Sequence, residues 1–222
     1  MLTAGAAHVW RVELSCVEDR VTALLDASER ARAAQIVDRQ KRRVWSRSRG
    51  VLRQLLACYL SADPHALRFV RGAHGKLTLA DACQAARPPL HFNLSHSGDI
   101  ALYAFTADAA VGVDVQLIRT QRQRGSYDRV NLTRRVFGEQ QAERLSTLDA
   151  DEREREFARL WTRYEAELKR RGIGIAGGSP THAEGLGGWI AELDIHPNGA
   201  AAVACGTAPR ELQMWEWAPP SS

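Results

Sequence analysis

Cysteine is scarce in this sequence, and long apolar runs are absent. The 222 residues include four cysteines (Cys16, Cys58, Cys83 and Cys205) that form no CxxC pair, which argues against a zinc site or a redox motif and favours buried free thiols. Apolar runs such as residues 100–105 are too short to span a bilayer, and the first residues lack a basic region followed by an apolar core. These absences predict a cytoplasmic chain without a membrane partner.

Aromatic residues are also few, at 7% of the sequence, and no RNA- or DNA-binding motif is recognisable. Positive charge is nevertheless clustered. Residues 39–53 include seven basic and no acidic side chains, and residues 119–135 include six arginines and one acid, Asp128. Two basic zones indicate contacts with two polyanions. A basic nucleic-acid-binding protein stays open as an alternative, which the shortage of aromatic residues weakens.

Local patterns in the first half predict strands and helices in alternation. Asp26 begins a helix with acid in its first turn, and the next helix is long and amphipathic, with Arg42, Arg49 and Arg53 grouped on one face. The expected elements are a strand over 8–14, helices from 26 and over 38–60, a short strand over 67–70, and strands over 100–105 and 111–115.

The second half repeats this plan from about residue 116. Helices are expected over 134–145 and 151–171, and strands over 189–195, 200–205 and 212–217. The dipeptide Asn198-Gly199 is typical of a tight turn, so the first two of these strands should form a hairpin.

Two motifs suggest other activities, which we set aside. Residues 172–177 satisfy GxGxxG, but that fingerprint binds dinucleotides between a strand and a helix start, whereas here it follows a helix, so Gly172 is interpreted as a helix C-cap. Ser95 and His96 could suggest a hydrolase. However, the G-x-S-x-G elbow is absent, and neighbours on an extended chain point to opposite faces.

Three blocks occur in a specific order: residues 92–97 (FNLSHS), 112–115 (GVDV) and 161–169 (WTRYEAELK). Together they resemble the signature of the Sfp-type 4'-phosphopantetheinyl transferases, and the resemblance extends over essentially the whole chain. It implies an α/β (α+β) fold, a pseudo-dimer of two similar halves, each a small, mostly antiparallel sheet with packed helices. The halves would be residues 1–115 and 116–222, with coenzyme A and the metal in the cleft between them.

The resemblance also implies an activity. Such an enzyme transfers the 4'-phosphopantetheine moiety of coenzyme A to a serine of an apo acyl or peptidyl carrier protein and releases 3',5'-ADP. Carrier proteins of this kind serve fatty-acid, polyketide or nonribosomal-peptide biosynthesis. The alternative is a catalytically weak homologue that binds coenzyme A or a carrier protein.

The candidate metal ligands lie in or next to the second and third blocks. Asp114 and Gln116 lie at i and i+2 of a strand, so their side chains share a face, and Glu165 comes from a later helix. The family usually has carboxylates at these positions, so Gln116 is a departure that offers a neutral oxygen. Mg²⁺ is the expected metal, with Mn²⁺ as the alternative, because hard cations prefer oxygen ligands. Tyr164 stands where the family usually has lysine, and we expect it to pack in the core.

Further residues are assigned through the resemblance. Glu165, Lys169 and Asp114 are expected to be catalytic, with Glu165 as a base for the carrier serine. The residues expected to contact coenzyme A are Arg49, Arg53, Lys76, Ser95, His96 and Lys169. The simpler alternative for Glu165 and Lys169 is an exposed i, i+4 ion pair on a helix.

The second basic zone is the expected binding surface for the carrier protein. Carrier proteins are typically acidic around the modified serine, so cations close to the metal site would attract them. The predicted contacts are Arg122, Arg124, Arg129 and Phe137. We expect the chain to act as a monomer.

Overall fold

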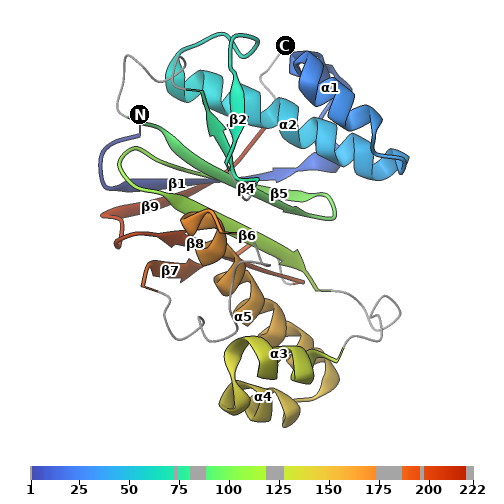
Figure 1. The fold of residues 1–222 in the computed structure, drawn as a ribbon, viewed down its shortest axis with the longest axis vertical. Coiled ribbons are helices and arrows are strands. Elements are labelled where there is room, and N and C mark those ends of the chain that lie inside the picture. The colour runs from blue at the N-terminus through green and yellow to red at the C-terminus, as the bar shows by residue number, and fades with distance from the viewer. Residues whose placement is uncertain are drawn as a thin grey trace.

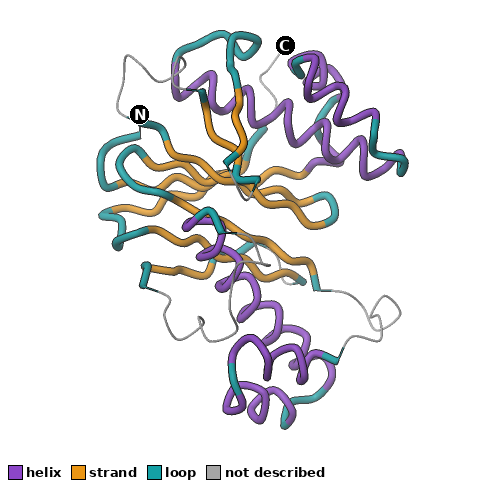
Figure 2. Tube along the Cα trace, in the orientation of Figure 1, coloured by secondary structure: helices purple, strands orange, loops and turns teal. Residues whose placement is uncertain are grey.

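The computed structural model describes residues 2–72, 75–80, 89–118, 128–173, 187–195 and 198–218. It is a mixed α+β structure with two small sheets back to back and helices on both outer sides (Figures 1 and 2). In the first half the elements are β1 (Ala6–Glu13), η1 (Leu14–Cys16), η2 (Asp19–Leu24), α1 (Ala27–Ala34), α2 (Arg39–Leu60), β2 (Phe69–Arg71), β3 (Leu77–Leu79), β4 (His91–Ser97) and β5 (Ile100–Thr106). They are followed by β6 (Val111–Leu117), α3 (Arg129–Phe137), α4 (Glu139–Ser146), α5 (Ala150–Arg171), β7 (Trp189–Glu192), β8 (Gly199–Cys205) and β9 (Glu211–Glu216).

The helices begin where acidic caps are available. The Asp26 carboxylate accepts from the Glu29 backbone N–H, and Glu29 returns a bond to the Asp26 backbone, which completes a capping box. The Asp38 and Asp149 carboxylates likewise accept from backbone N–H groups in the first turns of α2 and α5. One predicted helix, over 134–145, is wrong: the chain breaks at Gly138, whose φ of 88° ends α3 and precedes α4.

The two sheets pack face to face, and together they contain all the described strands except β2 and β3. The first has the order β4-β5-β1-β9 and the second β6-β8-β7, while β2 and β3 form a separate pair. The predicted hairpin is confirmed, because β7 pairs antiparallel with β8. The strand predicted at 212–217 exists as β9, but it lies beside β1 in the first sheet, and the pairing is parallel. The C-terminal strand therefore completes the N-terminal sheet (Figure 1).

Three apolar layers hold this arrangement together. One lies between α2 and the first sheet, with Leu52, Leu56 and Phe105 fully buried. A second lies between the sheets and includes Val9 and Val203. A third, built from alanines, lies between α5 and the second sheet. The expected fold class, two halves with small sheets and packed helices, is confirmed.

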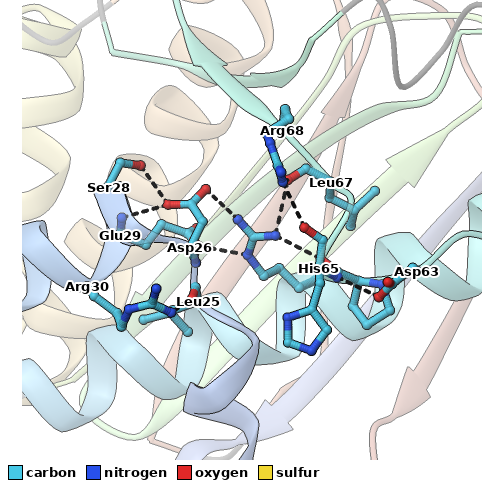
Figure 3. Close-up of polar contacts among 11 residues, drawn as sticks. Leu25, Asp26, Ser28, Glu29, Arg30, Asp63, His65, Leu67 and Arg68 are labelled. Carbon is cyan, nitrogen blue, oxygen red and sulfur yellow. Dashed lines mark hydrogen bonds and ion pairs between the residues drawn. The ribbon is translucent and has the colours of Figure 1, made fainter.

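Arg53 lies in an internal ion cluster, so the prediction that it contacts coenzyme A is wrong. Its side chain is 0% exposed. It donates to the carboxylates of Asp26 and Glu29, each at 2.7 Å, and to the carbonyls of Pro64 and Leu67. Asp26, Glu29 and Leu67 are labelled in the close-up of this cluster (Figure 3). A buried arginine needs such partners because an unpaired buried charge is strongly destabilising. Arg53 therefore fastens α1 and the residues before β2 to α2.

Three of the four cysteines are among the described residues, and they differ in exposure. Cys205 is buried, as expected, whereas Cys16 and Cys58 are exposed, so the buried-thiol prediction is wrong for these two. Cys83 lies outside the described residues. Among the described helices, none is sufficiently long and apolar to cross a membrane.

Candidate active site

A pocket of about 440 Å³ opens where the two halves meet. Residues of α2, β4 and α5 line it, together with the turn before β3. Five residues that were predicted to bind coenzyme A or to take part in catalysis are in the lining: Arg49, Lys76, His96, Glu165 and Lys169. Most of these can carry positive charge, so the pocket is suited to an anionic ligand.

Asp114 lies at the centre of the polar network beside this pocket. It is a buried residue of β6, and its Oδ1 accepts from Ser95 Oγ at 2.7 Å and from Lys169 Nζ at 2.5 Å. The Lys169 ammonium also donates to Ser95 Oγ at 2.9 Å. The three side chains come from β4, β6 and α5, so this network joins both halves of the chain.

Glu165 is the second carboxylate of the site. Trp161 Nε1 donates to Glu165 Oε1 at 2.8 Å, and Lys169 Nζ lies 3.8 Å from Glu165 Oε2. Burial raises the pKa of Glu165, and the charge of Asp114 raises it further, while Lys169 and Trp161 oppose the shift. Glu165 and Lys169 are thus not an exposed helical pair, the alternative left open by the sequence.

A close contact between helix and strand brings these groups together. Gly112 of β6 lies against α5 so tightly that an added Cβ would be 2.0 Å from the Ala166 carbonyl oxygen. Only glycine permits that approach, which explains the glycine of the GVDV block. The contact places Asp114, two residues later, against the turn of α5 that carries Lys169.

Arg49 is the best-placed cation from α2. Its guanidinium lies 5.2 Å from the centre of the Trp45 ring, and its buried Nη1 has no hydrogen-bond partner among the described residues. Burial lowers the pKa of Arg49. A buried donor without a partner is costly, and an anionic ligand in the pocket would satisfy it.

Lys76 joins the two halves at the other side of the pocket. Its Nζ donates to the Arg170 carbonyl at 3.0 Å and to the Val111 carbonyl at 3.2 Å. Burial, with a contribution from Arg170, lowers the pKa of Lys76 to about 8. The sequence predicted a contact with the nucleotide, and that contact stays a prediction.

Ser95 and His96 point in different directions from β4, as expected for strand neighbours. Ser95 is buried against Asp114 and Lys169, which gives it partners within the protein. His96 is exposed and lines the pocket. Loss of hydration beside the pocket lowers the pKa of His96, and the positive charges of Lys169 and Arg49 lower it further. Ser95 and His96 therefore do not face each other.

The carboxylates suit a hard cation. Among the described residues, no group of three or more His, Cys, Asp and Glu side chains could hold a metal. The half-buried Gln116 shares the Asp114 face of β6, so it can offer a neutral oxygen beside the two carboxylates. Asp114 and Glu165 already hold the Lys169 ammonium beside them, so the residues fit a positive charge at this position.

The predicted carrier surface is only partly described. Arg122 and Arg124 lie outside the described residues. Arg129 pairs with Glu154 at 3.1 Å, and its guanidinium lies 4.5 Å from the centre of the Phe157 ring. Phe137 packs edge-on against Tyr164, which is buried as the sequence predicted.

Comparison with known proteins identifies the family. The family described as "4'-phosphopantetheinyl transferase superfamily" matches residues 110–218, and "4'-phosphopantetheinyl transferase, N-terminal" matches residues 10–108. The transferase HetI of Nostoc sp. is 34% identical over 178 residues, which are 79% of this chain and 72% of HetI. The chain belongs to the 4'-phosphopantetheinyl transferase superfamily.

Two further transferases resemble the chain over shorter segments. AcpT of Escherichia coli K12 is 33% identical over 123 residues, which are 54% of this chain and 55% of AcpT. Sfp of Bacillus subtilis is 25% identical over 126 residues, which are 57% of this chain and 50% of Sfp. The family and the enzyme class expected from the three blocks are thus confirmed.

Some functional contacts of this transferase were not predicted. Trp161 begins the third block, and its indole N–H donates to Glu165. Glu167, 0% exposed, pairs with Arg170 and Arg171 and supports the end of α5. Asn93 binds the backbone of β6. Of these three residues, only Asn93 could have been singled out from the sequence, because Asn93, Ser95 and Ser97 are polar residues at alternate positions of the first block.

Proposed function

We propose that this chain transfers the 4'-phosphopantetheine arm of coenzyme A to a serine of an apo acyl or peptidyl carrier protein. The observation that supports it is the convergence of Asp114, Glu165 and Lys169 beside a pocket that contains Arg49 and His96. Carboxylates for a metal and a base, next to cations for phosphates, are the groups that this reaction needs.

In the proposed reaction the carrier serine oxygen attacks the phosphorus nearest the pantetheine. The bond from that phosphorus to the bridging oxygen of the pyrophosphate breaks, and 3',5'-ADP leaves. Glu165 accepts the serine proton. Lys169 and His96 face the pyrophosphate, and Arg49 and Lys76 hold the nucleotide phosphates.

Asp114, Glu165 and Gln116 would hold a Mg²⁺ ion. The ion would supply positive charge to neutralise the pyrophosphate and stabilise the leaving group. Ser95 keeps Asp114 oriented through its 2.7 Å hydrogen bond. Gln116 supplies a carbonyl oxygen in place of a charged ligand, so we expect weaker metal binding than with three carboxylates.

We further propose that the carrier approaches the second half near α3 and that the enzyme acts as a monomer in the cytoplasm. Arg122, Arg124 and Arg129 would attract acidic carrier residues, with Phe137 next to them. The pairing of Arg129 with Glu154 leaves it less available than an open arginine. Attraction of this kind acts mainly on the association rate and weakens with salt.

Mass spectrometry of an apo carrier protein, incubated with the enzyme, coenzyme A and Mg²⁺, tests the function. We expect a phosphopantetheine mass gain that EDTA abolishes and excess Mg²⁺ restores. Asp114→Ala and Glu165→Ala should each remove the gain, because one remaining carboxylate cannot hold the metal tightly. Glu143→Ala, at an exposed position of α4, is the matched control and should retain full activity.

The carriers offered should include fatty-acid, polyketide and nonribosomal-peptide types. If none gains mass while coenzyme A still binds, the chain is a binding homologue and the transferase proposal is wrong. If Asp114→Ala transfers at the normal rate in saturating Mg²⁺, the metal assignment fails while the activity stands.

A further inference from the structure

The free edge of β6 is covered by side chains of the first half. β6 is an edge strand of the second sheet, paired with β8 on one side. Val111, Val113 and Leu117 are separated by even numbers of residues, so their backbone polar groups point to the same edge. That edge faces β4, and β4 belongs to the other sheet.

Three hydrogen bonds pair backbone groups of this edge with side chains of the first half. The Val113 N–H donates to Asn93 Oδ1 at 3.0 Å, and the Leu117 N–H donates to Ser97 Oγ at 3.0 Å. Lys76 Nζ donates to the Val111 carbonyl at 3.2 Å. We call Asn93, Ser97 and their two partners on β6 the polar seam.

The polar seam has matching spacing on its two strands. Asn93 and Ser97 are four residues apart, and so are Val113 and Leu117. Ser95 and Asp114 lie between the two anchor bonds and bind each other. The apolar layer between the sheets is non-directional, so it permits small slides. Two directional hydrogen bonds at fixed spacing oppose such slides.

We propose that the polar seam sets the alignment of the phosphate-binding half against the reacting half, with Asn93 as its main positioning residue. Arg49 and His96 lie on α2 and on the first sheet, whereas Asp114 lies on the second sheet and Glu165 and Lys169 lie on α5, which packs against it. A slide along the seam would leave each set intact and shift coenzyme A relative to the carboxylates. This inference rests on the proposed transferase function.

Loss of alignment should therefore lower kcat more than it raises KM. For Asn93→Ala we expect kcat to fall at least about tenfold while the KM for coenzyme A stays within about twofold. Asn93→Asp keeps the Oδ1 acceptor and should restore most of kcat. The added negative charge near the phosphate cations should raise the KM for coenzyme A in that variant.

Asn93 also lines the pocket, so the competing explanation is a direct contact with coenzyme A. That explanation predicts a raised KM with an unchanged kcat in Asn93→Ala, and this result would overturn the proposal. A lower kcat in Asn93→Ala that Asn93→Asp does not restore would also overturn it. Ser97 does not line the pocket, so Ser97→Ala should lower kcat severalfold without changing the KM.

Amide hydrogen exchange supplies a readout that needs no activity. In Asn93→Ala the Val113 amide should exchange faster, and in Ser97→Ala the Leu117 amide should do so, with the β8 amides unchanged. If Asn93→Ala does not fold, Asn93→Asp and Ser97→Ala carry the test. Unchanged exchange in Ser97→Ala would refute the polar seam, whereas a wild-type enzyme without transfer activity would refute only the proposed function.

Discussion

Lys76 has an environment unlike that of an ordinary surface lysine. Its ammonium lies between the Val111 and Arg170 carbonyls, one at the start of β6 and one at the end of α5. Both are backbone oxygens, so no carboxylate offsets the cost of burial, and the pKa falls to about 8. Lys76 is therefore charged at neutral pH and close to losing that charge.

This pKa predicts a pH dependence. Below about pH 8 Lys76 is an ammonium and attracts phosphate, and above it the charge is lost. The value of kcat/KM for coenzyme A should thus fall as pH rises through 8, since kcat/KM reports the free enzyme. Bound phosphate favours the charged form, so the same step in kcat should occur at higher pH. Steady-state kinetics from pH 6.5 to 9.5 checks this.

Lys76→Arg is the comparison variant. Arginine keeps its charge throughout that range, so its profile should lack the step near pH 8. If wild type and Lys76→Arg show the same profile, Lys76 does not contact the nucleotide and serves only to join β6 and α5.

At this scale the sequence indicates which side chains lie together where a motif contains them, but it does not show partners that are remote in the chain. Asp114, Glu165 and Lys169 were chosen from their blocks, and they lie together. Arg53 was assigned with Arg49 through the resemblance, and the two share a helix face. A helical wheel cannot show that Asp26 and Glu29 reach one arginine and leave the other facing the pocket.

At the scale of elements, the contact between β6 and α5 determines where the reacting groups lie. The Ala166 carbonyl and the Arg170 backbone N–H both lie against Gly112. α5 therefore approaches the strand as closely as backbone atoms allow. Its next turn then brings Lys169 to Asp114.

Gly112→Ala should separate this helix from the strand. The new Cβ would be 2.0 Å from a backbone oxygen, so α5 must move, and we expect a destabilisation of about 3 kcal/mol with loss of transfer activity. Gly206→Ala is the control, because its Cβ would lie at an ordinary 3.7 Å from Arg170 Nη1. Thermal unfolding followed by circular dichroism compares the two. Equal melting temperatures would contradict the close contact.

The boundaries of the elements were predictable where local chemistry fixes them. Asp26 and Asp149 cap their helices, and Gly172 ends α5 with a φ of 72°. The break at Gly138 was not predicted, because a single glycine within an apolar periodic pattern is often tolerated in a helix. The turn at Gly138 lets α3 and α4 both contact α5, an arrangement that a local pattern does not contain.

At the scale of the whole molecule, β9 ties the end of the chain to its beginning. Ala6 to Arg11 pair with Glu211 to Glu216 in parallel. Leu212 and Met214 cover part of the apolar layer between the sheets. The sequence placed this strand in the second half, because neither periodicity nor turn signals identify a partner about two hundred residues away.

Truncation tests the importance of this strand. A chain that ends at Thr207 lacks β9 and leaves one edge of β1 unpaired. We expect a fall in melting temperature of about 10 °C or more, together with aggregation, since an open strand edge pairs with other chains. A chain that ends at Ala218 keeps β9 and is the control. Similar melting and solubility for both would show that β9 adds little.

The parallel pairing of β1 with β9 also has a consequence for the newborn chain on the ribosome. β9 lies roughly two hundred residues after β1, so that length of chain must be translated before the two strands can meet. At about 5 to 20 residues per second this takes about 10 to 40 s. During that time one edge of β1 lacks its partner strand and can pair with a neighbouring nascent chain.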